Sequence, residues 1–177
     1  MKGFLLGIIV TIALITVAVF LYFSRGLAPV ATAAPPMPFE TRLAKMALNA
    51  RIEKEMPQAV PIQPDDANLI EGAHLYTEHC AVCHGLPGQE KTATAQGMYP
   101  EPPELFLEKG VTKGVTDDPP GENYWKAANG IRLTGMPAFK NSLSDKQLWQ
   151  VSLLLTNADK ISQAVKDALQ PQTATPR

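Results

Sequence analysis

The segment Cys80-Ala81-Val82-Cys83-His84 decides what kind of domain this chain can form. It contains both cysteines of the chain, and the C-x-x-C-H spacing is the attachment signature of a covalently bound haem. Two thiols about one helical turn apart can each add to a vinyl group of one haem, and the next residue can then reach the iron. We therefore expect Cys80 and Cys83 to hold haem c, and His84 to supply a neutral imidazole nitrogen as an axial ligand.

Three other interpretations of the cysteines remain to be weighed. A thioredoxin-like dithiol also uses C-x-x-C, but it needs a preceding strand and a βαβ setting, which the surrounding sequence does not indicate. A zinc site could recruit His79 with Cys80, Cys83 and His84, although one tetrahedral ion cannot easily take adjacent pairs from a single turn. A disulfide between the two cysteines would close a short, strained loop. The complete motif favours haem attachment over all three.

The haem iron of an electron carrier usually takes a second protein ligand, and His/Met ligation raises its reduction potential. Met98 and Met136 are the candidates that follow the motif. Met136 stands in Gly135-Met136-Pro137, where glycine permits close approach and proline stiffens the turn. The chain between His84 and Met136 is also the longer one, so it can wrap around the opposite haem face. We expect Met136 to be the distal ligand; core packing is the alternative role for either methionine.

The N-terminal region contains an uncharged apolar run, FLLGIIVTIALITVAVFLYF, over residues 4–23. It has about the 20 residues that are needed to cross a bilayer. A cleaved signal peptide is the alternative, because Ala31-Thr32-Ala33 offers a cleavage site, although the apolar part of such peptides is usually roughly 7–15 residues long. We predict a transmembrane anchor, or a signal peptide, over residues 1–25. Lys2 and Arg25 balance across the run and do not orient it.

Beyond the anchor, the sequence predicts a spacer, a helix and one compact domain. Residues 26–63 form a Pro-rich spacer whose first part extends over about 40 Å, at roughly 3.1 Å per residue. Within the spacer, apolar residues at steps of three and four predict an amphipathic helix over residues 39–56. A domain over residues 64–169 and a flexible tail over residues 170–177 complete the predicted organisation.

Helix signals divide the compact domain. Asp65 and Asp66 are suitable N-caps for a helix that runs to Cys80. Ser144-Asp145-Lys146-Gln147 is a capping-box pattern ahead of a last helix that ends near residue 157. Shorter helical stretches are expected over residues 92–96, 104–109, 124–129 and 161–169. No window alternates with period two, so we predict an all-α fold.

From residue 64 to about residue 157 the chain resembles class I cytochromes c, in the bacterial single-haem form related to the cytochrome modules of cbb3-type oxidases. The resemblance rests on the C-x-x-C-H motif, on Asn129-Gly130-Ile131 ahead of Gly135-Met136-Pro137, and on Gly72, Tyr76 and Cys80 at steps of four. It implies three to five short helices around one covalent haem. The anchor, the spacer and the helix over residues 39–56 lie outside it.

The resemblance also implies roles for individual residues. The first and last helices of the domain would cross at Gly72 and Tyr76, and their partners on the last helix would be Leu148, Trp149 and Ser152. The carbonyl of Pro87 would accept the imidazole N–H of His84 and fix its tautomer. The segment Pro102-Pro103-Glu104-Leu105 would cover the haem.

Two further histidines and three residues ahead of Met136 also bear on the site. His74 and His79 both lie on the proximal side, so we expect them on the surface rather than at the opposite haem face. Tyr124, Trp125 and Arg132 could contact the haem propionates, since arginine pairs well with carboxylates. Packing is an equally good interpretation for each of them.

The expected function is the transfer of single electrons between respiratory membrane complexes on the extracytoplasmic side, where covalent haem attachment occurs. The expected partners are redox proteins in the membrane or periplasm, and the membrane itself through the N-terminal helix. The net charge of −1 without a basic stripe argues against nucleic acid, and electron transfer needs no small-molecule substrate. The alternative is a haem subunit of a membrane-bound dehydrogenase or oxidase complex.

Rival functions make distinct demands on the sequence. A haem peroxidase of this lineage would carry two C-x-x-C-H motifs, whereas this chain has one. A gas sensor or haem enzyme would lack the distal methionine and leave the iron open. A protein with only a structural or docking role would depend on the helix over residues 39–56. We therefore expect an electron carrier without enzymatic activity of its own.

Overall fold

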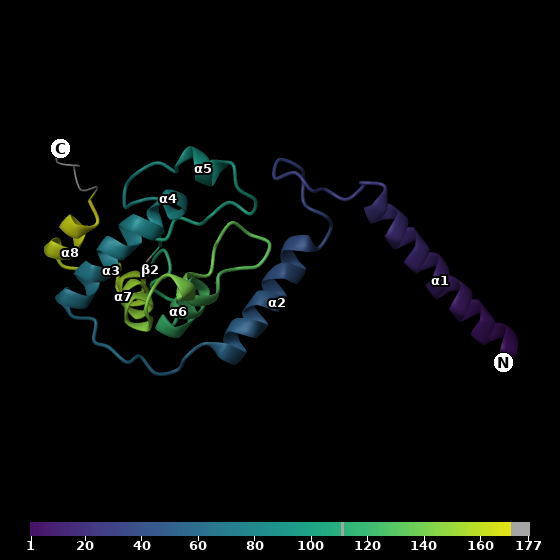
Figure 1. The fold of residues 1–177 in the computed structure, drawn as a ribbon, viewed down its shortest axis with the longest axis horizontal. Coiled ribbons are helices and arrows are strands. Elements are labelled where there is room, and N and C mark those ends of the chain that lie inside the picture. The colour runs from purple at the N-terminus through teal and green to yellow at the C-terminus, as the bar shows by residue number, and fades with distance from the viewer. Residues whose placement is uncertain (111, 171–177) are drawn as a thin grey trace. The chain divides into compact units, whose positions relative to one another are not determined.

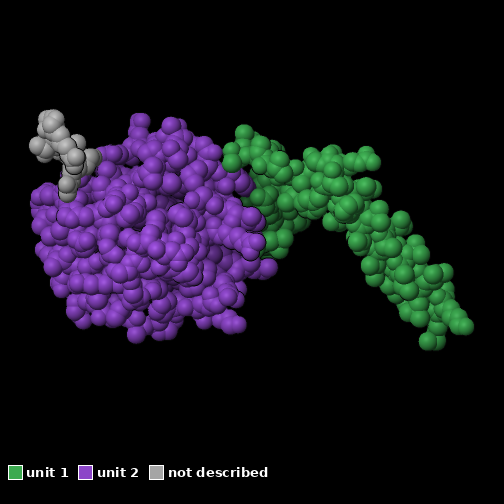
Figure 2. Space-filling view, in the orientation of Figure 1, with its two compact units in different colours: residues 1–43 green, residues 44–177 purple. Residues whose placement is uncertain are grey.

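The computed structural model describes residues 1–110 and 112–170. The chain divides into two compact units, Met1–Leu43 and the part from Ala44 onward (Figure 2). The predicted flexible tail lies outside the described residues, apart from Gln170. The domain boundaries expected from the sequence stay predictions.

The first unit contains helix α1, Lys2–Ser24, drawn in purple in Figure 1. None of its residues is buried, and it is the one helix in the described part of the chain that is long and apolar enough to cross a membrane. The hydroxyls of Thr11 and Thr16 donate to the carbonyls of Gly7 and Ile12, each at 2.9 Å. These bonds satisfy the two hydroxyl groups within the helix itself, as an apolar environment requires.

Helix α2, Glu40–Glu55, agrees closely with the predicted helix over residues 39–56. In its C-terminal half Ile52 is buried, and the Glu55 carboxylate accepts the indole N–H of Trp125, on α6 (Pro120–Asn129), at 3.3 Å. The apolar stripe that includes Leu43 and Met46 is exposed. The helix therefore contacts the domain near its C-terminal end.

The rest of the domain is mainly helical, which confirms the predicted all-α class. The remaining elements are α3 Asp66–His79, α4 Ala81–His84, α5 Ala93–Gln96, β1 Glu108–Lys109, β2 Thr112–Lys113, the 3-10 helix η1 Phe139–Asn141, α7 Asp145–Thr156 and α8 Gln163–Ala168. The helical stretch predicted over residues 104–109 is wrong, since that segment ends in β1, which pairs antiparallel with β2. Each strand of this hairpin has only two residues, too few to give a period-two signal in the sequence.

Capping residues set the helix ends largely as the sequence predicts. The Asp65 carboxylate accepts the Asn68 N–H at 2.9 Å at the start of α3. Ser144 and Gln147 form a complete capping box at the start of α7. Helix α6 begins at Pro120, four residues before the predicted start, because proline fits the first helical position, where no backbone N–H is needed.

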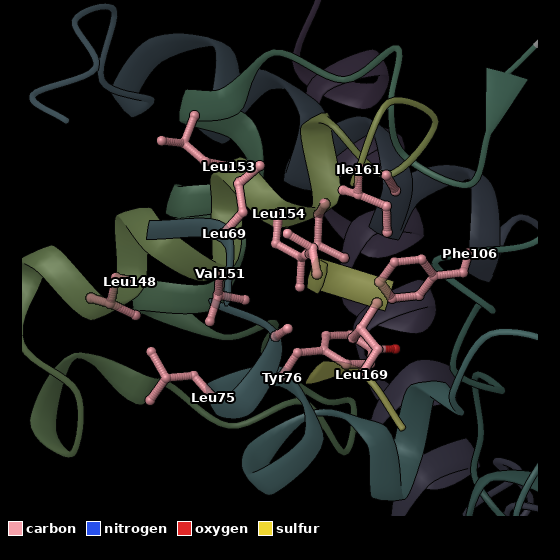
Figure 3. Packing of buried hydrophobic residues seen from close by; sticks show 14 of the residues in the cluster. Leu69, Leu75, Tyr76, Phe106, Leu148, Val151, Leu153, Leu154, Ile161 and Leu169 are labelled. Carbon is pink, nitrogen blue, oxygen red and sulfur yellow. The ribbon is translucent and has the colours of Figure 1, made fainter. Parts of the chain in front are cut away.

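The core forms where α3 crosses α7, with α8 packed against α3 (Figure 3). Tyr76 of α3 and Leu154 of α7 are fully buried there. A Cβ on Gly72 would lie 2.4 Å from the carbonyl oxygen of Gln150, so the two backbones approach as closely as glycine allows. The expected partners on α7, Leu148, Trp149 and Ser152, are buried, whereas the contacts with Gly72 come from Gln150 and Leu154.

Candidate functional site

The C-x-x-C-H motif forms a single tight turn at the end of α3. Cys80 is at once the C-cap of α3 and the N-cap of α4. The backbone N–H groups of Cys83 and His84 both donate to the Cys80 carbonyl, at 3.1 and 2.9 Å. This turn places the two cysteines one helical turn apart, the spacing that addition to two vinyl groups of one haem requires.

The fold around the motif removes the other interpretations of the cysteines. A helix precedes the motif where a thioredoxin-like site needs a strand. Cys80 and Cys83 are not joined in a disulfide. Among residues 1–110 and 112–170, no group of three or more His, Cys, Asp or Glu side chains is arranged to hold a metal ion, which argues against zinc. Burial raises the pKa of the Cys80 thiol to about 12, and Cys83 adds to the rise.

His84 is held by the segment Pro102-Pro103-Glu104-Leu105, which was expected to cover the haem. Its Nδ1 lies 2.8 Å from the carbonyl oxygen of Pro103, so Nδ1–H is the donor and Nε2 is left free for iron. Burial lowers the pKa of His84, and the bond to Pro103 offsets part of the fall. A neutral imidazole is the form that binds a metal. The prediction that Pro87 accepts this bond is wrong, because Pro103 is the acceptor and Pro87 lines a neighbouring cavity.

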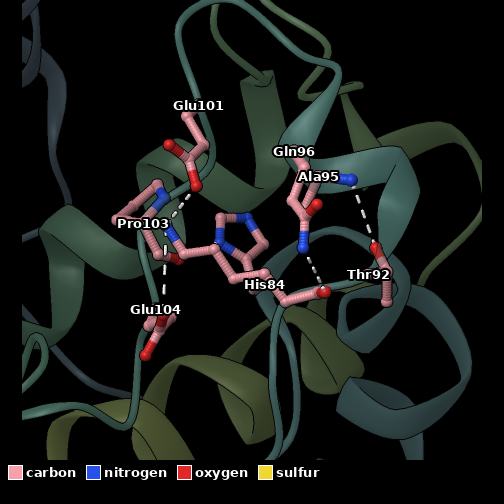
Figure 4. A network of polar contacts seen from close by, with 8 residues as sticks. His84, Thr92, Ala95, Gln96, Glu101, Pro103 and Glu104 are labelled. Carbon is pink, nitrogen blue, oxygen red and sulfur yellow. Dashed lines mark hydrogen bonds and ion pairs between the residues drawn. The ribbon is translucent and has the colours of Figure 1, made fainter.

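The segment that carries Pro103 is braced by a partly exposed lysine (Figure 4). The Lys91 ammonium lies 2.5 Å from the Glu101 carboxylate and 3.9 Å from that of Glu104, so it joins both ends of the segment. Ion pairs with this exposure contribute little to stability. Their effect here is positional, since they hold the backbone whose carbonyl orients His84.

A cavity of about 350 Å³ opens beside His84. Residues 84–89 line it on one side, and Glu104 and residues 106–108 complete the lining. Phe106, at its wall, meets Tyr76 edge-on with ring centroids 5.0 Å apart. Met136 does not line this cavity, which therefore lies on the His84 side of the site.

The loop that carries Met136 is closed by its own backbone. Ile131 N–H donates to the Met136 carbonyl at 3.2 Å. The Thr134 hydroxyl donates to the Ile131 carbonyl at 2.7 Å and accepts the Met136 N–H at 3.1 Å. Gly130, at φ +65°, lies against the backbone of residues 136–138. These contacts fix the backbone of Met136, whose side chain is half-buried.

The same loop contains a strained and exposed leucine. Leu133 has φ +61°, a left-handed conformation that is unfavourable for a bulky residue, and its side chain is 91% exposed. The bend that it allows returns the chain to Ile131, so that the Thr134 bonds can form. Sequence inspection could not identify this residue, because leucine carries no turn signal.

The other residues considered in the sequence lie away from this arrangement. His74 is exposed as expected, whereas His79 is half-buried beside Phe139, with ring centroids 6.0 Å apart, so its expected surface position is only partly right. Tyr124 stacks on Trp149 at 4.3 Å and donates to Asp145 at 2.5 Å. Together with the Trp125–Glu55 bond, these contacts favour packing over haem propionates as the role of both aromatic residues.

The residues of the site fit a covalently attached haem. The structure supplies two thiols on one turn, an imidazole with Nδ1 engaged and Nε2 free, and a thioether on a braced loop. The sequence did not identify Pro103 as the partner of His84, nor Gly130 as the support of the Met136 backbone. Both depend on loop contacts that no local pattern records.

The buried hydroxyl of Tyr76 ties α3 to the end of the motif. It donates to the Gly85 carbonyl at 2.7 Å, and the residue is fully buried. We expect Tyr76→Phe to lower the free energy of unfolding by about 1–3 kcal/mol, because a buried carbonyl loses its donor. Denaturant unfolding measures the change. Tyr124→Phe is the control, since its hydroxyl meets an exposed carboxylate; an equal loss in both variants would contradict the argument.

Comparison with known proteins supports the same kind of site. Residues 67–153 match the family described as "Cytochrome C oxidase, cbb3-type, subunit III", over just under half of the chain. The matched region contains the C-x-x-C-H motif and Met136. No curated protein matches the chain.

One solved structure is also similar, a chain of the reducing HAO-like protein complex of Kuenenia stuttgartiensis. It is 24% identical and has a TM-score of 0.46; the alignment covers 59% of this chain and 52% of that one. This chain thus matches about half the length of that protein.

Proposed function

We propose that this chain, in which residues 67–153 form a c-type cytochrome domain of the cbb3-type subunit III family, carries single electrons between membrane redox complexes. In this proposal Cys80 and Cys83 hold the haem through thioethers. His84 and Met136 would supply the two protein ligands of its iron. The geometry of these residues supports each assignment, and the family supports the haem itself.

When bound, haem c supplies an iron that gains and loses one electron. The residues of this chain determine how that iron is held. Pro103 orients His84 through Nδ1, which fixes the tautomer and increases the basicity of Nε2. The Thr134 and Ile131 bonds hold the loop of Met136, whose thioether ligation raises the reduction potential.

The observation that carries the proposal is the pairing of two braced ligand positions. The His84 imidazole is held by the Pro103 carbonyl, and the Met136 backbone is held by the Thr134 hydroxyl and the Ile131 N–H. Two fixed ligands would leave no iron position open to a substrate. They would also limit movement of the ligands when the iron changes its oxidation state. This arrangement favours electron transfer over the haem enzyme or gas sensor, which need an open position.

The proposed location is the extracytoplasmic face of a membrane. Helix α1 is of the right length and composition for a retained anchor, and c-type domains are usually found outside the cytoplasm. A tethered domain needs only a weak, short-lived contact with each redox partner. The second candidate is a haem subunit of a dehydrogenase or oxidase complex, which the family description favours.

Met136→Ala tests the proposal. We expect the variant to keep its covalent haem, to bind imidazole more tightly than the parent chain, and to have a lower reduction potential, because the sixth ligand is lost. Spectroscopic titration and redox potentiometry of the full-length haem-loaded chain in detergent measure the three properties.

Met46→Ala is the matched control for this test, because Met46 lies on the exposed stripe of α2. It should behave as the parent chain does. An unchanged spectrum and imidazole affinity in Met136→Ala would remove Met136 as a ligand and, with it, the case for a closed electron carrier.

A further inference from the structure

Met98 lies directly against the residue that precedes Met136. A Cβ on Gly135 would lie 1.7 Å from the Met98 methyl carbon and 3.4 Å from its sulfur. Apart from its neighbours in the chain, that Cβ would meet no other atom within 4 Å. The Met98 side chain therefore occupies the space that the missing side chain of Gly135 leaves free.

Hydrogen bonds link the backbone of Met98, through α5, to the C-x-x-C-H turn. Met98 follows α5, and its N–H donates to the Ala95 carbonyl at 3.2 Å. Thr92, the N-cap of α5, donates its hydroxyl to the Val82 carbonyl at 2.6 Å and accepts the Ala95 N–H at 3.1 Å. A short run of contacts thus leads from the cysteine turn through α5 to the loop of Met136.

The contact with Met98 complements the internal bonds of that loop. Gly130, Ile131 and Thr134 fix its backbone from the side of α6. Within this loop, Gly135 has no side chain that could pack against a neighbour. Leu133 adds backbone strain through its positive φ. A thioether packed on Gly135 opposes movement of the neighbouring Met136 without forming a hydrogen bond.

We propose that Met98 is a positioning residue that, by packing on Gly135, holds Met136 on the haem iron. The inference rests on the proposed ligation by Met136 and deepens it. Met98 strengthens the closed state of the site. Its thioether is needed for shape and not for ligation.

A double-mutant cycle on the full-length haem-loaded chain in detergent tests this role. The titrant is imidazole, which must displace Met136 from ferric iron. We expect Met98→Ala to raise the imidazole affinity about tenfold, the equivalent of about 1.4 kcal/mol in the closed state. In the Met136→Ala background the same change should have no effect, because no distal ligand remains to be held.

Two further variants separate packing from chemistry. Met98→Leu keeps most of the volume without sulfur and should retain both the methionine–iron charge-transfer band and the parent affinity. Gly135→Ala adds a methyl group that meets only Met98. It should raise the affinity in the parent chain and add nothing to Met98→Ala, because the displaced side chain is then already absent.

Each other outcome overturns the inference in a recognisable way. An equal rise from Met98→Ala with and without Met136 would show that Met98 merely shields the haem. Loss of the charge-transfer band in Met98→Leu, with a normal band in Met136→Ala, would make Met98 the ligand and would also refute the proposed ligation. No rise in Met98→Ala, with a rise in Met136→Ala, would reject the inference alone.

Discussion

Gly72→Ala is expected to lower the free energy of unfolding by about 3 kcal/mol, at the upper end of the usual cost of overpacking a core. The new Cβ would lie 2.4 Å from the oxygen and 2.8 Å from the carbon of the Gln150 carbonyl. Neither atom belongs to a side chain that can rotate away. The backbones of α3 and α7 must therefore separate, and the packing around Tyr76 and Leu154 is lost with them.

Denaturant unfolding of the haem-loaded protein measures this loss. Gly97→Ala is the matched control, because a Cβ there makes only ordinary contacts, 3.6 and 3.7 Å from carbonyl oxygens of α5, and φ is −87°. We expect the control to unfold within about 0.5 kcal/mol of the parent. Similar stability of the two variants would mean that the helices do not cross at Gly72.

Gly130→Ala should be comparably damaging, at about 3 kcal/mol, for two separate reasons. Gly130 has φ +65° and ψ −177°, a conformation that costs other residues about 1–3 kcal/mol. In addition, its new Cβ would lie 2.7–2.8 Å from backbone atoms of residues 136–138. Because that backbone carries Met136, the substitution should also raise the affinity for imidazole.

Gly85→Ala separates the two causes. Gly85 has nearly the same conformation, φ +75° and ψ 170°, but a Cβ there meets nothing within 4 Å. It should therefore show the conformational cost alone and leave the imidazole affinity unchanged. If Gly85→Ala opened the iron as Gly130→Ala does, contact with the Met136 backbone would not be the cause.

The helix ends and the class of the fold were largely predictable, because their signals are local. Asp65 and the Ser144–Gln147 box mark the starts of α3 and α7 through bonds within one turn of chain. One error comes from a strand pair too short to leave a signal in the sequence, and the other from a contact between residues far apart in the chain. Residues 104–109 form a turn and β1 instead of a helix, and the imidazole of His84 binds Pro103, nineteen positions along the chain, instead of Pro87.

The sequence by itself determined the candidate chemistry: the C-x-x-C-H motif indicates the cofactor and, with a methionine far along the chain, the candidate ligands. Only the tertiary structure decided how those ligands are held. Nδ1 of His84 lies against the Pro103 carbonyl, and the loop of Met136 contacts Gly130 and the side chain of Met98. The reason is physical: ligand identity is a property of single residues, whereas ligand position depends on van der Waals contacts and hydrogen bonds between loops that meet only in the folded chain.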